Sequence, residues 1–419
     1  MKVHHPYQIT HLKLDTQPLV ADISTAQKGN YLVFWWKDIP LGHLFIYPEE
    51  KLSKSDFYNK VIGAILPAIQ YYIYEQKAAT PDWTVWLINQ NMMAWNTWME
   101  NLLSSYLVTT IPAQVPVSVV ICTRNRAQDL KTCLEMLKLL VCQPEEILVV
   151  DNAPTDNSTR EVAAQFAGVT YIKEERPGLD IARNCGVVHA KSPVIAYVDD
   201  DVEVDSMWIY RVWEAFKDSQ TAAITGLVLA AELQTEAQFL FERYWSFNRG
   251  YVDKAYGKDY FDQTLPYGPP IWEIGAGANM AFRKSVLEEV GLFDERLDVG
   301  AAGCNGDSEM WFRILYHGHT IRYTPRAVVY HKHRRNLEAL NRQLFSYMRG
   351  HAAAALIQQH MCKSAGYKRY LFWELPKWYF KMFRRGFPKY DARYRLLRTE
   401  ISGLGSGIMF YLKNRKVKV

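Results

Sequence analysis

The sequence predicts an α/β protein built on a mostly parallel β-sheet. Between residues 115 and 198, short runs of β-branched residues alternate with segments of helical periodicity, an order typical of βαβ units. The predicted strands are 117–122, 147–150, 169–172 and 194–198, and helical segments are predicted at 130–141, 162–166 and 179–188. Ligands of such sheets bind at the carboxyl ends of the strands. Functional side chains are therefore expected where these strands end.

The length of 419 residues, with 49 % hydrophobic residues, indicates two or three domains. Residues 1–110 are predicted to form an α+β accessory domain of unknown role, with strands at 31–36 and 41–47 and a helix at 55–74 capped by Ser53. Pro112 and Pro116 mark the link to the α/β domain, which is predicted at 115–335. A helical, basic and aromatic region is predicted at 336–419.

Charge is distributed unevenly along the chain. Residues 363–419 contain 15 Lys and Arg against 3 Asp and Glu, a local charge of +12, so residues 1–362 carry −7 of the total +5. The segment 367–385 also interleaves aromatic residues with cations, as interfacial segments on anionic lipid do. The alternative is an amphipathic helix packed on its own domain. Nucleic acid is not expected as a partner, because no recognisable binding module accompanies the charge.

The remaining composition indicates a cytoplasmic protein, with peripheral association at the inner face of the membrane as the added possibility. No run approaches the ~20 apolar residues of a membrane span, and the first seven residues lack a secretory signal. The six cysteines form no Cys-x-x-Cys pair, which favours buried thiols in a reducing compartment over disulfides or a zinc site.

Three consecutive carboxylates, Asp199, Asp200 and Asp201, follow the predicted strand at 194–198. Adjacent like charges repel by about 1 kcal/mol at ~4 Å even in bulk water, and by more near a protein surface. A divalent cation would offset this repulsion, whereas hydration of an exposed turn would relieve it without a ligand. The residues alone leave both interpretations open.

Four ordered motifs carry a resemblance to a known family. They are 117–126 (VSVVICTRNR), 147–159 (ILVVDNAPTDNST), 176–186 (RPGLDIARNCG) and 196–201 (AYVDDD). Together they resemble the family 2 glycosyltransferases of the GT-A fold, over about residues 115–333. The resemblance implies a Rossmann-like sheet flanked by helices and a nucleotide-sugar donor. A dinucleotide dehydrogenase is disfavoured, because no glycine follows the strand at 117–122.

The resemblance implies roles for several residues of the nucleotide pocket, which are Thr123, Arg124, Asp151, Arg183 and Asn184. An acid at the end of the second strand, as at Asp151, can accept hydrogen bonds from a base or from ribose. The alternative roles are a strand-end hydroxyl, surface arginines and a turn asparagine. The family more often has two acids where this chain has Asp151 followed by asparagine, so one contact differs here.

For the metal, the resemblance implies Asp201 as the direct ligand of Mg²⁺ or Mn²⁺, with Asp199 near the donor ribose and Asp200 assisting. Such a cation neutralises a departing nucleoside diphosphate. His331, with His333 as second choice, ends a predicted strand where related enzymes place a ligating histidine. A structural role for this histidine is the alternative.

Asp307 occupies the position of the general base in the motif at 303–313, and Gly306 replaces an acid usual in the family. Asp307 also precedes a helical run, where it would be a preferred N-cap, and both roles are compatible. The glycines of 272–283 resemble the loop under the acceptor site. Aromatic residues crowd between 239 and 272, and most are expected in the core.

The function predicted is non-processive, inverting transfer from a nucleoside-diphosphate sugar, most simply a UDP-sugar, to a hydroxyl of a saccharide or lipid-linked saccharide, in polysaccharide or glycolipid assembly. The Gln-x-x-Arg-Trp motif and membrane helices of processive members are absent from the sequence. The alternatives are a sugar-phosphate nucleotidyltransferase, which would need a Gly-rich loop after the first strand, and a non-catalytic carbohydrate- or nucleotide-binding protein.

Overall fold

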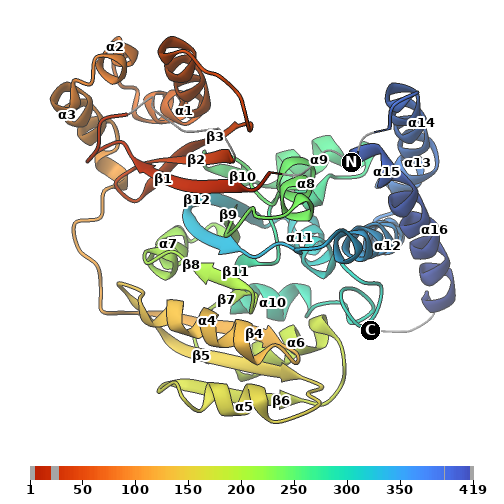
Figure 1. The fold of residues 1–419 in the computed structure, drawn as a ribbon. Coiled ribbons are helices and arrows are strands. Elements are labelled where there is room, and N and C mark those ends of the chain that lie inside the picture. Colours follow the sequence, from red (N-terminus) through yellow and green to blue (C-terminus); the bar gives the residue numbers. More distant parts are fainter. Residues whose placement is uncertain (1–4, 20–27, 391, 416–419) are drawn as a thin grey trace.

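The computed structural model describes residues 5–19, 28–390 and 392–415, and it confirms the mixed α/β fold (Figure 1). Among these residues nine strands form the main sheet. They are β4 (Gln114–Thr123), β5 (Gln143–Asn152), β6 (Val169–Glu174), β7 (Val194–Val198), β8 (Val202–Val204), β9 (Thr221–Ala230), β10 (Lys254–Tyr256), β11 (Asn279–Arg283) and β12 (Thr320–His331).

The centre of the sheet is parallel and positions the site. Strands β7, β4, β5 and β6 lie side by side in parallel, as the sequence predicts, and β11 is inserted antiparallel between β7 and β9. In this register Thr123 at the end of β4 lies opposite Asp151 on β5, and Asp199 follows directly after β7. The carboxyl ends of the strands therefore meet at one edge.

Helices cover both faces of the main sheet (Figure 1). Strand β4 is apolar on both faces, and both must therefore be covered. Val120 packs into the core on one face, whereas Val119 and Ile121 pack into the core on the other. The helices are α4 (Ala127–Lys138), α5 (Ser158–Ala163), α6 (Leu179–His189), α7 (Trp208–Ala215), α8 (Glu236–Tyr244), α9 (Lys258–Thr264), α10 (Lys284–Val290) and α11 (Gly306–Tyr316), with short 3₁₀ turns at Leu265–Tyr267 and Ile271–Glu273.

The N-terminal region is α+β, as predicted. It comprises β1 (Tyr7–Lys13), β2 (Gly29–Trp36), β3 (Ile39–Ile46), α1 (Lys54–Gln76), α2 (Trp83–Ile88), α3 (Met92–Leu102) and a 3₁₀ turn at Ser104–Tyr106. Ser53 caps α1 by accepting a hydrogen bond from the Asp56 N–H at 3.1 Å. Strand β1 and the helices α2 and α3 were not anticipated from the sequence.

Strand β2 is buried on both faces. Leu32, Phe34 and Trp36 pack against the N-terminal helices, while Tyr31, Val33 and Trp35 share a core with residues of β9 and β12. The N-terminal sheet is therefore pressed between its own helices and the main sheet. The domain boundaries proposed above stay predictions.

The C-terminal region is helical, as predicted, and lies on a different side of the main sheet from the N-terminal helices (Figure 1). It comprises α12 (Leu337–Met361), α13 (Tyr367–Arg369), a π-helical turn (Tyr370–Glu374), α14 (Leu375–Gly386), α15 (Ala392–Arg395) and α16 (Leu397–Asn414). Gly407 lets α16 approach α12, since a Cβ there would lie 2.1 Å from the Arg349 carbonyl oxygen. Within the described residues, no helix combines the length and apolarity required to cross a bilayer.

Candidate active site

One large cavity of about 1610 Å³ opens at the carboxyl ends of the central strands. Its inner wall comes from β4, α6, the Asp199–Asp201 run, the glycine loop at 275–278 and the start of α11. Its outer wall comes from the end of α8 and from α12, α14 and α16. The C-terminal region thus completes a cavity whose chemistry is supplied by the main sheet.

Asp199, Asp201 and His331 meet at one end of this cavity. One ligand atom from each lies within 4.8 Å of the others, and no other group of this kind was found among the described residues. The Nε2 of His331 faces Asp201 Oδ1 at 3.4 Å. The strand order explains the meeting, because Asp201 leads into β8 and β8 pairs with the end of β12, where Val202 lies opposite His331.

Arginines already balance part of the acidic charge, which the sequence argument did not foresee. Arg126 contacts Asp200 Oδ1 at 2.6 Å and Asp201 Oδ2 at 2.9 Å, and Arg334 approaches the same Asp201 oxygen at 3.5 Å. Repulsion among the three aspartates is therefore not by itself evidence for a metal. Arg126 lies in the motif 117–126, but nothing in the sequence indicates that its side chain contacts Asp200.

The three carboxylates differ in their electrostatics. Burial, followed by repulsion from Asp201, raises the pKa of Asp199 to about 6. Burial also raises the pKa of Asp200. For Asp201, burial is outweighed by His331, Arg126 and Arg334, so its pKa is lowered. The pKa of His331 is lowered to about 4, chiefly by burial, so its ring is neutral near pH 7.

This donor set fits a divalent cation. Two carboxylate oxygens and a neutral imidazole nitrogen converge, with Asp199 facing the cavity and the other two side chains buried. Asp199, Asp201 and His331 are the residues that would hold the ion.

The residues expected around the nucleotide divide into two groups. Thr123, Arg124 and Arg183 line the cavity, and Thr123 donates to Asp200 Oδ2 at 2.7 Å. Asp151 and Asn184 do not line it. Asp151 is fully buried and accepts from the Tyr171 hydroxyl at 2.9 Å, while the Asn184 amide bonds both backbone groups of Phe293, at 2.8 and 2.9 Å.

Asn184 in this structure therefore braces a loop, which is the alternative role that the sequence left open. Asn152, the neighbour of Asp151, does line the cavity. Its side chain accepts from the Gly178 N–H and donates to the Arg176 carbonyl, each at 2.8 Å. The amide can do both, whereas a carboxylate could only accept.

Asp307 lies in the first turn of α11 and lines the cavity. The N-cap is Asn305, so the N-cap role suggested for Asp307 is wrong by two positions, because α11 begins at Gly306. The Asp307 Oδ1 accepts from the Ser308 N–H at 2.6 Å. Burial of the carboxyl raises its pKa, although Arg183 opposes the shift. A carboxylate of raised pKa is a stronger base than an exposed one.

Packing against Asp180 explains why a glycine occupies position 306. A Cβ at this position would lie 2.0 Å from Asp180 Oδ2. Asp180 is buried and contacts Arg183 at 2.9 Å, and Arg183 also contacts Asp298 at 2.7 Å. The carboxyl group of Asp180 thus occupies the space that a side chain at 306 would need.

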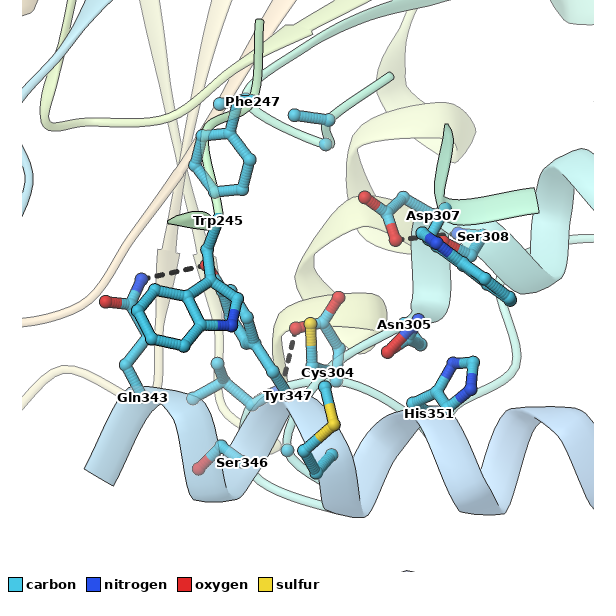
Figure 2. A pocket seen from close by; sticks show the side chains of 18 of the residues that line it. Trp245, Phe247, Cys304, Asn305, Asp307, Ser308, Gln343, Ser346, Tyr347 and His351 are labelled. Atoms are coloured by element: carbon cyan, nitrogen blue, oxygen red, sulfur yellow. Dashed lines mark hydrogen bonds between the residues drawn. The ribbon is translucent and has the colours of Figure 1, made fainter. Parts of the chain in front are cut away.

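Aromatic side chains face Asp307 across the cavity. Figure 2 shows Trp245, Phe247 and Tyr347 on the opposite side from Asp307, where they form an aromatic wall above α12. Trp272 and His351 also line the cavity, with ring centroids 4.8 Å apart, and Figure 2 shows His351 on the same side as Asp307. Three of these residues come from the aromatic segment 239–272, whereas Tyr347 and His351 carried no signal in the sequence.

Similarity to known proteins supports a glycosyltransferase that uses nucleotide-sugar donors. The profile of the family described as "Glycosyl transferase family 2" matches residues 118–291, so this segment of the chain is similar to that family. The matched residues include Asp199–Asp201, while Asp307 and His331 lie beyond them.

Two curated relatives have names of the same class. "Glycosyltransferase AglE" of Haloferax volcanii is 26 % identical over 251 residues, which cover 57 % of this chain and 72 % of the relative. "Glucosyl-dolichyl phosphate glucuronosyltransferase" of the same organism is 24 % identical over 244 residues, covering 55 % and 70 %. A solved structure, the mannosyltransferase PcManGT from Pyrobaculum calidifontis in complex with GDP-Man and Mn²⁺, is 16 % identical, with 71 % of this chain and 88 % of that chain covered at a TM-score of 0.45.

Proposed function

We propose that the protein transfers a single sugar, with inversion, from a nucleoside-diphosphate sugar to a hydroxyl of a lipid-linked saccharide. The observation that carries the proposal is that two chemically distinct acidic centres open into one cavity. The Asp199–Asp201–His331 cluster lies among the strand ends, and Asp307 faces the aromatic wall. The first suits a diphosphate with its cation, and the second suits an acceptor hydroxyl.

In the proposed reaction, Asp307 takes the proton of the acceptor hydroxyl as its oxygen attacks the anomeric carbon. The bond from that carbon to the diphosphate oxygen breaks on the opposite face, and its electron pair leaves with the nucleoside diphosphate. One displacement inverts the configuration. A divalent cation at the cluster would neutralise the leaving group. Because an imidazole is among the ligands, we favour Mn²⁺ over Mg²⁺.

The donor can be identified by thermal stability. We would measure unfolding with UDP, GDP and CMP, each with Mn²⁺, with Mg²⁺ and with EDTA. A ligand at about 100 times its Kd adds about 2.7 kcal/mol to the free energy of unfolding. We expect a metal-dependent shift with UDP that is lost in Asp201→Asn. A thermal shift with GDP alone would indicate a GDP-sugar donor instead of a UDP-sugar. Shifts that do not depend on the metal would contradict the metal site.

The acceptor proposal rests on the surface beside the cavity. Aromatic side chains of the π-helical turn and α14 are exposed, by 61 % for Trp373 and 65 % for Phe380. Lys377, Lys381 and Arg384 of α14 are also exposed. Lys377, Trp378 and Lys381 also line the cavity, so this surface adjoins its mouth. Rings and cations in this arrangement suit an anionic lipid surface that presents a glycolipid.

One relative's name points to the same class of acceptor, since it describes a transferase acting on glucosyl-dolichyl phosphate. We therefore propose peripheral binding at an anionic membrane. The test is sedimentation with vesicles of phosphatidylglycerol or phosphatidylcholine at low salt. We expect binding to the former alone, weakened in a Trp373→Ser, Phe380→Ser variant and unchanged in Met93→Ser, which alters an exposed residue of α3. Equal binding of all variants would exclude this surface.

A further inference from the structure

A chain of buried polar groups leads from the N-terminal sheet to the metal cluster. The Tyr31 hydroxyl of β2 donates to Glu242 Oε1 at 3.2 Å, and Glu242 Oε2 lies 2.9 Å from His333 Nε2. The Nδ1 of His333 then lies 3.2 Å from the Nδ1 of His331. Each of these four residues is at most 6 % exposed. Three elements that are distant in the sequence thus converge on His331.

The direction of these hydrogen bonds can be deduced from Glu242. Its Oε1 accepts from the hydroxyls of Tyr31 and Ser246, the latter at 3.1 Å. A carboxylate surrounded by donors only accepts hydrogen bonds, so the His333 Nε2 must carry hydrogen. We take the His333 ring as neutral, so that its other nitrogen is an acceptor and presents a lone pair at Nδ1 toward His331.

Two nitrogens that face each other at 3.2 Å need one hydrogen between them. Because His333 accepts, His331 must donate from its Nδ1. The neutral His331 ring then has no hydrogen on Nε2, which is the atom that faces Asp201 and the cavity. A histidine that ligates a metal needs this lone pair, and its tautomer is set by the hydrogen bond at its other nitrogen.

We propose that Tyr31, Glu242 and His333 are positioning residues that fix His331 as the Nδ1–H tautomer and so prepare its Nε2 to bind a divalent cation. The inference rests on the metal site proposed above. It assigns the N-terminal region a part in that site, because β2 supplies the hydroxyl that holds Glu242. Rings of Phe241 and Phe247 pack against His333 and His331, at centroid distances of 4.6 and 5.4 Å, and hold them in place.

The tautomer can be read without metal. Long-range ¹H–¹⁵N correlation spectra of the full-length protein, labelled at histidine and kept in EDTA, distinguish Nδ1–H from Nε2–H. The His331 signals are assigned by their loss in His331→Asn. We expect hydrogen on Nδ1 of His331 and on Nε2 of His333. Hydrogen on Nε2 of His331 would overturn the proposal, since that atom would then donate to Asp201.

The second measurement is Mn²⁺ affinity in the presence of UDP, followed by the electron paramagnetic resonance signal of free Mn²⁺. We expect His333→Phe to weaken the affinity about 10–100-fold, the usual effect of removing such a partner, and Tyr31→Phe to weaken it less. The matched control is His319→Phe, which removes a histidine that lies 3.0 Å from Glu289. His319 directly precedes β12, whereas His331 ends that strand.

The outcomes separate the two proposals. If the wild-type protein binds no Mn²⁺, the metal site fails, while the spectra still report the tautomer. If the wild type binds Mn²⁺ and His333→Phe binds equally well, the positioning role alone fails. Should His333→Phe not fold, Tyr31→Phe and the wild-type spectra decide the question, because they leave both rings in place.

Discussion

The two acidic centres of the cavity differ in how their charge is stabilised. At Asp201, the neighbouring His331, Arg126 and Arg334 outweigh burial and lower the pKa, and Arg126 contacts the carboxylate directly at 2.9 Å. The Asp307 carboxyl, in contrast, has Arg183 as its main favourable electrostatic neighbour and accepts backbone hydrogen bonds in a buried position that raises its pKa. Direct charge pairing keeps a carboxylate ionised and suits a ligand-binding role, whereas burial makes a carboxylate more basic. The comparison teaches that adjacent acids of one cavity can be prepared for opposite tasks.

The sharpest test of this difference is Asp307→Asn. We expect turnover to fall about 10²–10⁴-fold, the usual share of a general base, while the metal-dependent stabilisation by UDP persists. The rate of transfer to a glycolipid acceptor and the melting temperature provide the two readouts. Asp262→Asn, which alters an exposed carboxylate of α9 paired with Lys258, is the control and should change neither. Unchanged turnover in Asp307→Asn would remove the assigned role.

The pH dependence tests the same point. A base acts when ionised, so kcat should fall about tenfold per pH unit below the pKa of Asp307. Burial raises that pKa. As pH is lowered, kcat should therefore begin to fall at a higher pH than it would with an exposed aspartate as the base. Stability should respond with the opposite sign, since the folded state favours the protonated form and gains stability as pH falls through the raised pKa. If kcat falls only near pH 4, the pKa of Asp307 is not raised.

At the other centre, Asp200→Asn and Asp201→Asn should separate stability from binding. Asp200 holds Thr123 and Arg126, so its replacement should cost about 1–3 kcal/mol of stability yet retain the Mn²⁺-dependent shift with UDP. Asp201→Asn should lose that shift. Chemical denaturation and calorimetric titration measure the two quantities. Loss of the shift in both variants would mean that the arginine pairing and the ligand site are one unit.

The smallest effects concern glycine positions. Gly306→Ala places a Cβ against Asp180, and overpacking of this kind costs about 1–3 kcal/mol. The control is Gly63→Ala in α1, where a Cβ meets nothing within 4 Å and where alanine should stabilise by about 0.4–1 kcal/mol. Thermal unfolding compares them. A neutral Gly306→Ala would show that Asp180 can move, and that the environment of Asp307 is less rigid than described.

The sequence predicted the sheet well because its strands have strong local patterns. The runs at 147–150 and 194–198 lie inside β5 and β7, and Asp199–Asp201 follows β7 as expected. Strand β1, in contrast, was missed. Its residues are mixed in burial, and it forms by pairing with β2 across a segment of the chain. Such pairing depends on tertiary contacts rather than on local periodicity.

Within the site, several residues on the motifs of the resemblance could be predicted, and residues outside those motifs could not. Thr123, Arg183 and Asp201 lie on these motifs and line the cavity. Glu242 and His351 come from helices whose patterns indicate only amphipathic packing, and which side chains turn toward the cavity depends on how α8 and α12 dock. Asn184 shows the converse, because a polar residue on a matching motif braces the backbone of Phe293 instead of lining the cavity.

The burial of β2 on both faces has a consequence for proteolysis of the protein. Tyr31, Val33 and Trp35 cover Leu227, Leu229 and Val328 of the main sheet. A protease that removed the N-terminal region would uncover this apolar face, and the remaining sheet would be prone to associate with itself. The N-terminal region therefore shields an apolar face of the sheet that carries the site.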